Sequence, residues 1–459
     1  MGKITDKGFV TTLTDDYSVF LNAGNSLKQM TVKNFRQHLN DNDAEVLNDL
    51  AFGFAVNEAS ASGAARVDTY GNDHMRAIWE DMKEIVLMDK NGNFCPLNKK
   101  DAHFLENGTQ IADTTTHALT GNWANADVMV IIPEHYGRIQ TVVVGNNTYL
   151  RPWFSPVPLP GGYVIPQQVV GKFKASKISN ALRSVPNQVP HANIKIDAFW
   201  SLAQTRSKNH GLANLDFRNY LLVHMMSKYG WRDSQGCKNS DNSLVWGVGL
   251  DGTESTLQSG QSDKFAVQKN IVTGATLALG VDDGKSAVAD ANGDTCHSVN
   301  VAGFENPWGQ YWEMVGGLCS VGSTVYCWRS NFIPPTSSDP TAATFAKVPH
   351  VELTRPTVEN NSNNVQNIIA SQDGQGLYFV PQASVNAGNI TYNDHYYYAA
   401  NGQLWLFGGD SLNGAYCGLA CAGSYIVWSS SSARISARLA FYGEVTRVSA
   451  ERLAELLAA

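Results

Sequence analysis

The segment from Gly408 to Phe441, GGDSLNGAYCGLACAGSYIVWSSSSARISARLAF, constrains this 459-residue chain more than any other part of it. Eighteen of its 34 residues are Gly, Ser or Ala, and it contains no Lys, Glu, Gln or Met. A half-buried strand alternates apolar and polar residues, and a flexible linker is polar throughout. This segment does neither, so we expect a rigid frame that displays interchangeable side chains. The frame consists of Gly408, Gly409, Gly414, Gly418, Trp428, Arg438, Leu439 and Phe441.

The composition of the whole chain narrows the class of protein. Charged residues make up 16% of the chain, well below the usual quarter or so, and Gly, Asn, Ser and Thr take their place. A net charge of −7 argues against a nucleic-acid partner, which would need a basic, clustered surface. This composition suits turns and strands on an exposed, robust particle better than it suits a metabolic enzyme.

Targeting signals and cysteines indicate where the chain is made. The N-terminal residues MGKITDKGF include no apolar signal sequence, and no uninterrupted apolar run approaches about 18 residues, so we expect neither secretion nor membrane insertion. The seven cysteines are odd in number and scattered, which argues against a disulfide framework and favours synthesis in a reducing cytosol.

Local patterns predict the elements of the first third. Residues 17–21 and 27–32 are expected to be two strands joined by the turn Asn22–Asn25, and residues 34–40 favour the start of a helix. A second helix is predicted for His74–Val86, with the 3.5-residue seam of a coiled coil. Asn91-Gly92 predicts a hairpin turn. The seam is formed by Met75, Ile78, Trp79, Met82, Ile85 and Val86.

Local patterns in the rest of the chain predict strands and two helices. From Val128 the segments VMVIIP, TVVVG and GYVIP predict strands, and Leu215–Tyr229 predicts a helix that Gly230 ends. Ala450–Leu457 predicts a short amphipathic helix at the C-terminus. Six tryptophans are expected to anchor the core, namely Trp246, Trp308, Trp312, Trp328, Trp405 and Trp428.

Two short motifs resemble catalytic signatures. Gly409-Asp-Ser-Leu412 matches the GDSL signature of serine esterases, but no histidine follows His395, so the downstream base that activates such a serine does not exist. Residues 247–252, GVGLDG, fit a phosphate-binding glycine loop, but the apolar helix that must follow it is missing. We interpret both as coincidental matches.

Three further patterns favour structural roles over metal chemistry. Residues 290–294, DANGD, resemble part of a calcium loop without its later bidentate Glu and favour a turn, although a structural calcium elsewhere stays open. Cys417 and Cys421 have no histidine cluster beside them and are expected to be buried thiols. His210 and His224 are expected to be structural. We predict neither a metal site nor a cofactor.

Three motifs in roughly the last third of the chain together resemble a known family. FENPWGQYWEMVGG at 304–317 is followed by LFGG at 406–409 and ARLAF at 437–441. Their order and spacing resemble the C-type-lectin-like fold of the formylglycine-generating-enzyme type. The variant most resembled is the variable protein of diversity-generating retroelements, found in phage receptor-binding proteins and bacterial surface adhesins. The resemblance spans roughly residues 120 to 445 and implies an α+β fold of that type.

The retroelement resemblance implies which residues form a ligand-binding face. Those elements mutate adenines, typically in AAY codons for asparagine, and the reachable amino acids exclude Lys, Glu, Gln, Met and Trp. Between Ser411 and Ser436 the only such residue is Trp428, a frame position. Chance absence from a short Gly/Ser/Ala-rich segment is the alternative. The implied binding residues, with Tyr and Arg as natural hot spots, are Ser411, Leu412, Tyr416, Ala420, Ala422, Ser424, Tyr425, Ile426, Val427, Ala433, Arg434 and Ser436.

The first residues carry a second, independent resemblance. LTDD at 13–16, VFL at 19–21 and KQMTVKNF at 28–35 resemble the N-terminal attachment module of phage fibre proteins. The expected division is therefore an attachment module at 1–40, a helical and β connector that oligomerises at 41–118, and a lectin-like ligand-binding domain at 119–459 with its variable region at about 404–441. The short predicted seam and the advantage of multivalent display favour a homotrimer.

These resemblances imply a non-enzymatic receptor-binding fibre of a phage or prophage virion, made in the bacterial cytoplasm. Its expected partners are a host cell-surface protein or glycan and, through the N-terminus, other virion proteins. One alternative is a copper-dependent formylglycine-generating oxidase, which places a copper-binding cysteine a few residues after the Gly-Gly pair. Here Asp410–Asn413 contain none, and Cys417 comes later and is paired too closely with Cys421. A structural virion decoration protein is the other alternative.

Overall fold

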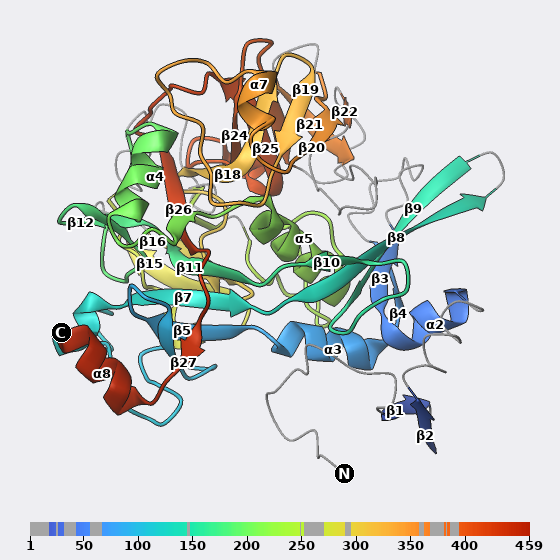
Figure 1. The fold of residues 1–459 in the computed structure, drawn as a ribbon, viewed down its shortest axis with the longest axis horizontal. Helices are drawn as coiled ribbons and strands as arrows, with labels where there is room; N and C mark the ends of the chain where they lie inside the picture. Colours follow the sequence, from blue (N-terminus) through green and yellow to red (C-terminus); the bar gives the residue numbers. More distant parts are fainter. Residues whose placement is uncertain are drawn as a thin grey trace.

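Figure 1 shows the computed structural model of the chain. The structure describes residues 18–23, 26–31, 43–55, 67–144, 147–247, 249–251, 270–289, 295–357, 362–367, 381, 383–385 and 394–459. These residues form a mixed α+β arrangement that is mostly sheet with few helices, as the expected fold class requires.

One large sheet holds most of the described strands. Its members are β5 (Glu84–Met88), β6 (Asn93–Pro96), β7 (Asp127–Ile132), β11 (Gln168–Lys174), β14 (His210–Leu212), β18 (Trp312–Val321), β19 (Thr324–Cys327), β20 (Val351–Thr354), β21 (Ser362–Asn367), β22 (Ala383–Val385), β23 (His395–Tyr398), β24 (Leu404–Gly408), β25 (Gly418–Ile426), β26 (Ile435–Phe441) and β27 (Thr446–Arg447). The main path runs β22-β21-β23-β25-β24-β18-β26-β11-β7-β5-β6-β27, while β14 pairs with β26, and β19 joins β18 to β20.

The remaining strands form smaller sheets. A five-stranded sheet has the order β10-β8-β9-β3-β4. Its strands are β3 (Phe52–Ala55), β4 (Asp68–Gly71), β8 (His135–Val144), β9 (Asn147–Ser155) and β10 (Tyr163–Ile165). Three small sheets comprise β1 (Ser18–Ala23) with β2 (Ser26–Thr31), β12 (Ser176–Ile178) with β13 (Ala181–Arg183), and β15 (Gly284–Ala289) with β16 (Thr295–Val301) and β17 (Phe304–Glu305).

The helices of the described residues are short. They are α2 (Asp43–Leu50), α3 (Asp73–Asp81), α4 (Ile196–Gln204), α5 (Leu215–Tyr229), α7 (Ala342–Phe345) and α8 (Ala450–Ala458), with 3-10 turns η1 (Gly121–Asn125), η2 (Gly249–Asp251), η3 (Leu277–Leu279) and η4 (Gly414–Tyr416). Within the described ranges, none is both long enough and apolar enough to traverse a bilayer.

Helix α5 occupies the interior between the two larger sheets (Figure 1) and matches the predicted helix residue for residue. Asn214 caps its start, since its side chain accepts a hydrogen bond from the Asp216 N–H at 3.1 Å. Gly230 ends it in the left-handed conformation, with φ of 66°. The helix packs on β18, β25 and β11 of the large sheet and on β3 of the smaller one. It is therefore buried on nearly every side.

The predicted helix His74–Val86 is wrong in its second half. Helix α3 ends at Asp81, and β5 begins at Glu84. Ile85 lies opposite Val130 of β7, inside the large sheet. Branched side chains such as Ile85 pack well on a pleated surface, and here tertiary packing outweighs the helical periodicity.

The coiled-coil seam that this helix was expected to form therefore does not exist. Trp79 is fully buried within its own fold, where its ring meets that of Phe52 edge-on with centroids 5.4 Å apart. Met75 and Met82 also pack partly against this core. Helix α3 thus serves the core of its own chain, and the expected homotrimer loses its helical support.

The expected boundary between residues 118 and 119 falls inside one sheet and one core. Strands β5 and β6 precede it and β7 follows it, yet β5 pairs with both. Leu97 and Leu105 belong to the same hydrophobic cluster as Phe217 and Trp405. Residues 84–118 therefore fold together with the rest of the large sheet and do not form a separate connector.

Several local predictions are confirmed. All six tryptophans are buried in the core. The turn at Asn91-Gly92 joins β5 to β6, and Gly92 has a φ of +90°. Helix α8 forms at the predicted C-terminal segment, capped by Ser449. Strands β1 and β2 pair from Ser18↔Thr31 to Ala23↔Ser26, as expected for residues 17–32. The features predicted at 34–40 and 290–294 lie outside the described residues.

Candidate ligand-binding surface

The segment expected to vary forms two interior strands of the large sheet and two connections that reach the surface. Strand β25 lies between β23 and β24, and β26 lies between β18 and β11. Most side chains of both strands are buried. The connections at 409–417 and 427–434 precede and follow β25. Side chains available to a ligand are therefore concentrated in these connections and at the end of β25.

Two frame glycines shape the first connection. Gly408 and Gly409 have φ values of +85° and +69°, a region that residues with a Cβ atom enter only at a cost. A Cβ atom on Gly409 would lie 2.6 Å from the Cys417 sulfur, and one on Gly408 would lie 2.5 Å from the Pro307 carbonyl oxygen. The sharp turn after β24 thus requires both glycines, in agreement with their expected role as a fixed frame.

Five of the twelve predicted binding residues are buried, which contradicts their placement on a binding face. The Ser424 hydroxyl lies 2.6 Å from the Tyr396 hydroxyl oxygen and accepts a hydrogen bond from Arg355 at 2.9 Å. The retroelement resemblance selected positions by the amino acids that mutation can place there. Which side chains face inward is decided instead by the pairing of β25 and β26 with neighbouring strands along both edges. The buried residues, at most 3% exposed, are Ser411, Ala420, Ala422, Ser424 and Ser436.

The other seven predicted residues reach the surface. Leu412 and Tyr416 are nearly half exposed, although large apolar side chains are usually covered. Ala433 is also exposed. The partly exposed members of the set are Tyr425, Ile426, Val427 and Arg434.

Four rings form one contiguous cluster, called here the aromatic surface: His395, Tyr397, Tyr416 and Tyr425. Tyr416 stacks on His395 with ring centroids 3.7 Å apart. His395 lies 5.7 Å from Tyr397, which lies 6.0 Å from Tyr425. The buried Trp312 meets both Tyr397 and Tyr425 edge-on, at 5.6 and 6.0 Å, and supports the cluster from below.

Polar contacts fix the ends of the aromatic surface. The Asn413 amide donates a hydrogen bond to the Tyr397 hydroxyl at 2.9 Å. Arg434 binds the fully buried Asp410 carboxylate through both Nε and Nη2, the latter at 2.7 Å. The hydrogen bond to Asp410 raises the pKa of Arg434. Because this paired geometry is rigid, the Arg434–Asp410 ion pair has a fixed position beside the rings.

The hydroxyls of Tyr397 and Tyr425 stay protonated at neutral pH. Burial raises the pKa of Tyr425 to about 12 and also raises the pKa of Tyr397. A protonated phenol both donates and accepts hydrogen bonds while its ring offers an apolar face. The surface can therefore meet polar and apolar groups of a ligand at once.

A buried ionic frame lies beneath this surface. Arg438 of β26 binds Glu313 of β18, with neither side chain exposed, and also donates to the carbonyl oxygens of Gly171, Lys172 and Glu305. These bonds satisfy a charge whose burial would otherwise cost several kcal/mol. The frame therefore locks β26 onto β18 and β11.

Strand β25 has its own anchor in helix α5. Arg218 is fully buried and donates hydrogen bonds to the carbonyl oxygens of Leu419 at 2.9 Å and of Pro307 at 2.7 Å. The first of these carbonyls belongs to β25 and the second to the motif at 304–317. The backbone behind the aromatic surface is thus held independently of the side chains that the surface displays.

Sequence reasoning missed His395, Tyr397, Asn413 and Asp410 as parts of this surface. The run HYYY at 395–398 is a concentration of rings that could have been noticed. What could not be read from it is that β23 pairs in parallel with β25, which places Tyr397 opposite Gly423. Only this pairing brings the run beside the variable segment.

The esterase-like motif has no catalytic geometry in the described residues. The Ser411 hydroxyl is buried and has no hydrogen-bond partner there, while the neighbouring Asp410 carboxylate binds Arg434. A serine nucleophile needs a base within hydrogen-bond reach. In the glycine loop at 247–252, Gly247 has a φ of 69° and Gly249–Asp251 form the short turn η2, while residues 248 and 252 lie outside the described ranges.

Cysteines and histidines occupy the structural positions expected of them. Cys417 and Cys421 are buried; the Cys417 thiol donates to the Asp410 carbonyl at 3.0 Å, and burial raises the pKa of Cys421. His210 and His224 are buried, and His224 binds Asp283 at 2.8 Å. Among the described residues, no group of three or more His, Cys, Asp or Glu is arranged to hold a metal ion.

Comparison of the sequence with models of known protein families and with curated proteins gave no match.

Proposed function

We propose that this chain is the receptor-binding adhesin of a phage or prophage virion and that the aromatic surface contacts a host cell-surface protein or glycan. The observation that carries the proposal is the cluster of stacked and tilted rings formed by Tyr416, His395, Tyr397 and Tyr425 beside the Arg434–Asp410 pair. Tyr and Arg are the residues that dominate binding energy in recognition surfaces. Tyrosine offers a large contact area with few rotatable bonds to immobilise.

The backbone is held by buried ionic residues that are separate from the exposed side chains, and this separation supports a diversified binding protein. Arg438, Glu313 and Arg218 hold the backbone from inside the molecule. Leu412, Tyr416 and Ala433 point outward from the connections and take no part in that frame. Such an arrangement tolerates exchange of the outer side chains without loss of the fold, because surface substitutions away from buried networks change stability little.

The proposed finer fold is the C-type-lectin-like fold of the formylglycine-generating-enzyme type. Its support is that two of the three segments carrying the resemblance meet in space. Trp312–Met314 pair in parallel with Ile435–Ala437, and the ion pair of Glu313 with Arg438 joins the same two segments. Leu406 and Phe407 of the segment LFGG lie in β24 and pair with the opposite edge of β18.

Two alternatives have less support. A copper oxidase needs a pair of thiolates that metal and substrate can reach, whereas Cys417 and Cys421 are buried, the first directly before β25 and the second within it. A decoration protein without a ligand would not need half-exposed Leu412 and Tyr416 side by side with a ring cluster. Attachment to the virion through residues 1–40 and assembly into a homotrimer remain parts of the proposal.

The adhesin proposal is tested by binding of the fluorescently labelled full chain to a panel of bacterial strains. For a strain that is bound, we expect the double variant Tyr416→Ala/Tyr425→Ala to bind at least about tenfold more weakly, because two hot-spot rings are lost. Val164→Ala is the control, since Val164 is 47% exposed but lies on β10 of the five-stranded sheet. Unchanged binding of the double variant would refute the proposed surface.

A further inference from the structure

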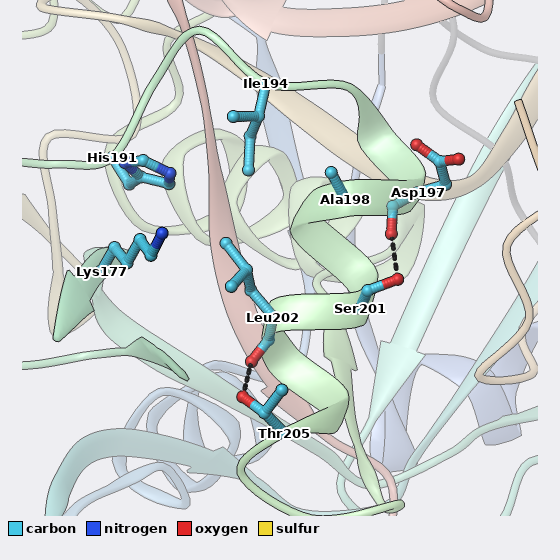
Figure 2. A pocket seen from close by; sticks show the side chains of 8 residues that line it. All are labelled: Lys177, His191, Ile194, Asp197, Ala198, Ser201, Leu202 and Thr205. Atoms are coloured by element: carbon cyan, nitrogen blue, oxygen red, sulfur yellow. Dashed lines mark hydrogen bonds between the residues drawn. The ribbon is translucent and has the colours of Figure 1, made fainter. Parts of the chain in front are cut away.

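A second candidate binding site lies in the groove between β12 and helix α4. The groove has a volume of about 520 Å³ and is open to solvent (Figure 2). Sites for small ligands have volumes of about 300 to 1,000 Å³. Lys177 and His191 form one wall, and Ala198, Leu202 and Thr205 line the wall formed by α4 and its C-terminal end.

The first wall carries the groove's positive charge. Figure 2 shows the Lys177 amine and the His191 ring pointing into the groove. Within the described part of the chain, neither side chain forms a hydrogen bond or an ion pair. The His191 ring is oriented by an edge-on contact with Phe199, with centroids 5.8 Å apart. Two uncommitted nitrogen-bearing side chains therefore face the same space.

Among the described residues that line the groove, Asp197 alone is acidic, and its carboxylate is turned away from these two nitrogens. The Asp197 carboxylate lies on the far side of α4 in Figure 2 and accepts hydrogen bonds from the Thr336 N–H and hydroxyl. It therefore does not neutralise Lys177. The groove is complementary to a negative charge in a chain whose net charge is −7.

The rest of the lining combines apolar carbon with hydroxyl oxygen. Ile194, Ala198 and Leu202 form an apolar face. The Ser201 and Thr205 hydroxyls each donate to a helix carbonyl, at 2.7 Å, which leaves both oxygens as acceptors. A ligand that fits this lining has an anionic group, an apolar C–H face and hydroxyl donors. A sugar acid combines all three.

The groove adjoins the second surface connection of the candidate binding segment. The Asn193 N–H donates a hydrogen bond to the Ser432 carbonyl at 3.0 Å, and the Ser432 hydroxyl accepts one from the Arg434 N–H at 3.1 Å. Asn193 lies between the lining residues His191 and Ile194. A chain of sugars seated in the groove could therefore continue past Ala433 towards the aromatic surface.

We propose that this groove is a fixed subsite for a carboxylate-bearing sugar of a host surface glycan. Lys177 and His191 bind the carboxylate, and the apolar face of Ile194 and Leu202 receives the C–H face of the ring. The subsite supplies constant affinity for one sugar class while the neighbouring exchangeable residues set selectivity. This inference rests on the proposed adhesin function for the source of the glycan, but the groove's preference for a sugar acid is measurable by itself.

The test compares two sugars that differ in one group. Saturation-transfer NMR with the full chain is recorded with methyl β-glucuronoside, which carries a carboxylate, and with methyl β-glucoside, which does not. We expect the glucuronoside to bind about tenfold or more tightly than the glucoside, as for the loss of one charge-assisted hydrogen bond. Equal binding of the two sugars overturns the proposal.

Lysine variants locate the binding. Lys177 is exposed on a short strand, so Lys177→Gln keeps the fold and is expected to weaken glucuronoside binding about tenfold. Lys208→Gln is the matched control, because Lys208 is also exposed near α4 but does not line the groove. Glucuronoside binding that survives Lys177→Gln unchanged would refute the site. Displacement of the glucuronoside by an equal concentration of acetate would refute the sugar class.

The failure of this inference can be told apart from failure of the adhesin function. The double variant Tyr416→Ala/Tyr425→Ala is expected to lose binding to cells and to keep the glucuronoside. Binding to cells without binding of the glucuronoside would refute the subsite and would be consistent with the adhesin proposal. Glucuronoside binding by a chain that binds no strain supports the subsite and counts against the adhesin.

Discussion

Arg438 and Glu313 form an ion pair with both side chains fully buried, although 125 residues of sequence separate them. Their contact joins the motif at 304–317 to the segment at 437–441, and Lys174 lies 3.9 Å from the same carboxylate. Burial lowers the pKa of Lys174 to about 7. The carboxylate compensates the buried charge of Arg438 and, against the effect of burial, favours the charged form of Lys174, so the packing of β18 against β26 depends on it.

Replacing this carboxylate should strongly destabilise the chain. We expect Glu313→Gln to lower the free energy of unfolding by about 3–5 kcal/mol, because it leaves Arg438 buried without a counter-charge. The measurement is urea denaturation. Glu352→Gln is the control, since Glu352 is exposed and pairs only loosely with His350 at 3.5 Å, so less than about 1 kcal/mol should be lost. Similar losses for both variants would contradict the role of the buried pair.

Stability should fall as the pH drops from about 6.5 to 4. Burial lowers the pKa of both His135 and His210 to about 4, so in this window the unfolded chain binds protons that the folded chain does not. Their stabilisation is complete above the unfolded pKa and falls as pH falls, by up to about 1.4 kcal/mol per pH unit for each histidine. Urea denaturation at pH 7.5, 6 and 5 measures this dependence.

Histidine variants assign the pH dependence. His210→Gln should flatten it, whereas His74→Gln should not, because His74 is exposed at the start of α3. An unaltered slope in His210→Gln would show that other groups bind the protons.

The turn after β24 should tolerate no side chain at Gly409. We expect Gly409→Ala to lower the free energy of unfolding by more than the roughly 1–2 kcal/mol of the left-handed conformation alone, because its Cβ would meet the Cys417 sulfur at 2.6 Å. Gly322→Ala separates the two effects, since Gly322 has a φ of +59° with no atom near its Cβ position. Thermal or urea unfolding measures the free energy of unfolding lost in each of the two variants, and equal losses would exclude the steric contribution.

The full chain is expected to assemble as a homotrimer through its first residues. Because Ile85 lies in a strand and Trp79 in the core, helix α3 offers no seam, and Ile78→Asp should leave the molar mass unchanged. A chain that starts at Asp43 should sediment as a monomer. Analytical ultracentrifugation at micromolar concentration measures the molar mass of the full chain, of the Ile78→Asp variant and of the chain that starts at Asp43. A monomeric full-length chain would contradict the trimer.

We expect no catalysis by the GDSL segment or the cysteine pair. The Ser411 hydroxyl is buried, and the Cys417 thiol donates to a backbone carbonyl. Ester hydrolysis and copper-dependent thiol oxidation should stay at background in the unaltered chain. Turnover that is lost in Ser411→Ala or in Cys417→Ser would overturn this expectation.

Local sequence signals predicted those elements whose structure depends on nearby residues. Asn214 and Gly230 delimit α5, and the turn at Asn91-Gly92 joins two strands, because caps and turns are settled by backbone preferences within a few residues. The segment at 82–86 was predicted wrongly for the opposite reason. Its apolar residues fit both a helix and a strand, and the choice depends on β7, which lies about 40 residues further on.

The segment at 408–441 likewise combines features that the sequence predicted with features that it did not. The sequence by itself predicted that Gly408 and Gly409 belong to a fixed frame, and its retroelement resemblance implied that Leu412, Tyr416 and Arg434 are exchangeable, since residue types and their spacing can be read directly from a chain. Only the tertiary structure decided that Ala422 and Ser424 face inward and that Tyr397 joins Tyr425. Side-chain direction in a sheet depends on which strands flank it, and β23, β24 and β25 pair through contacts that no local pattern encodes.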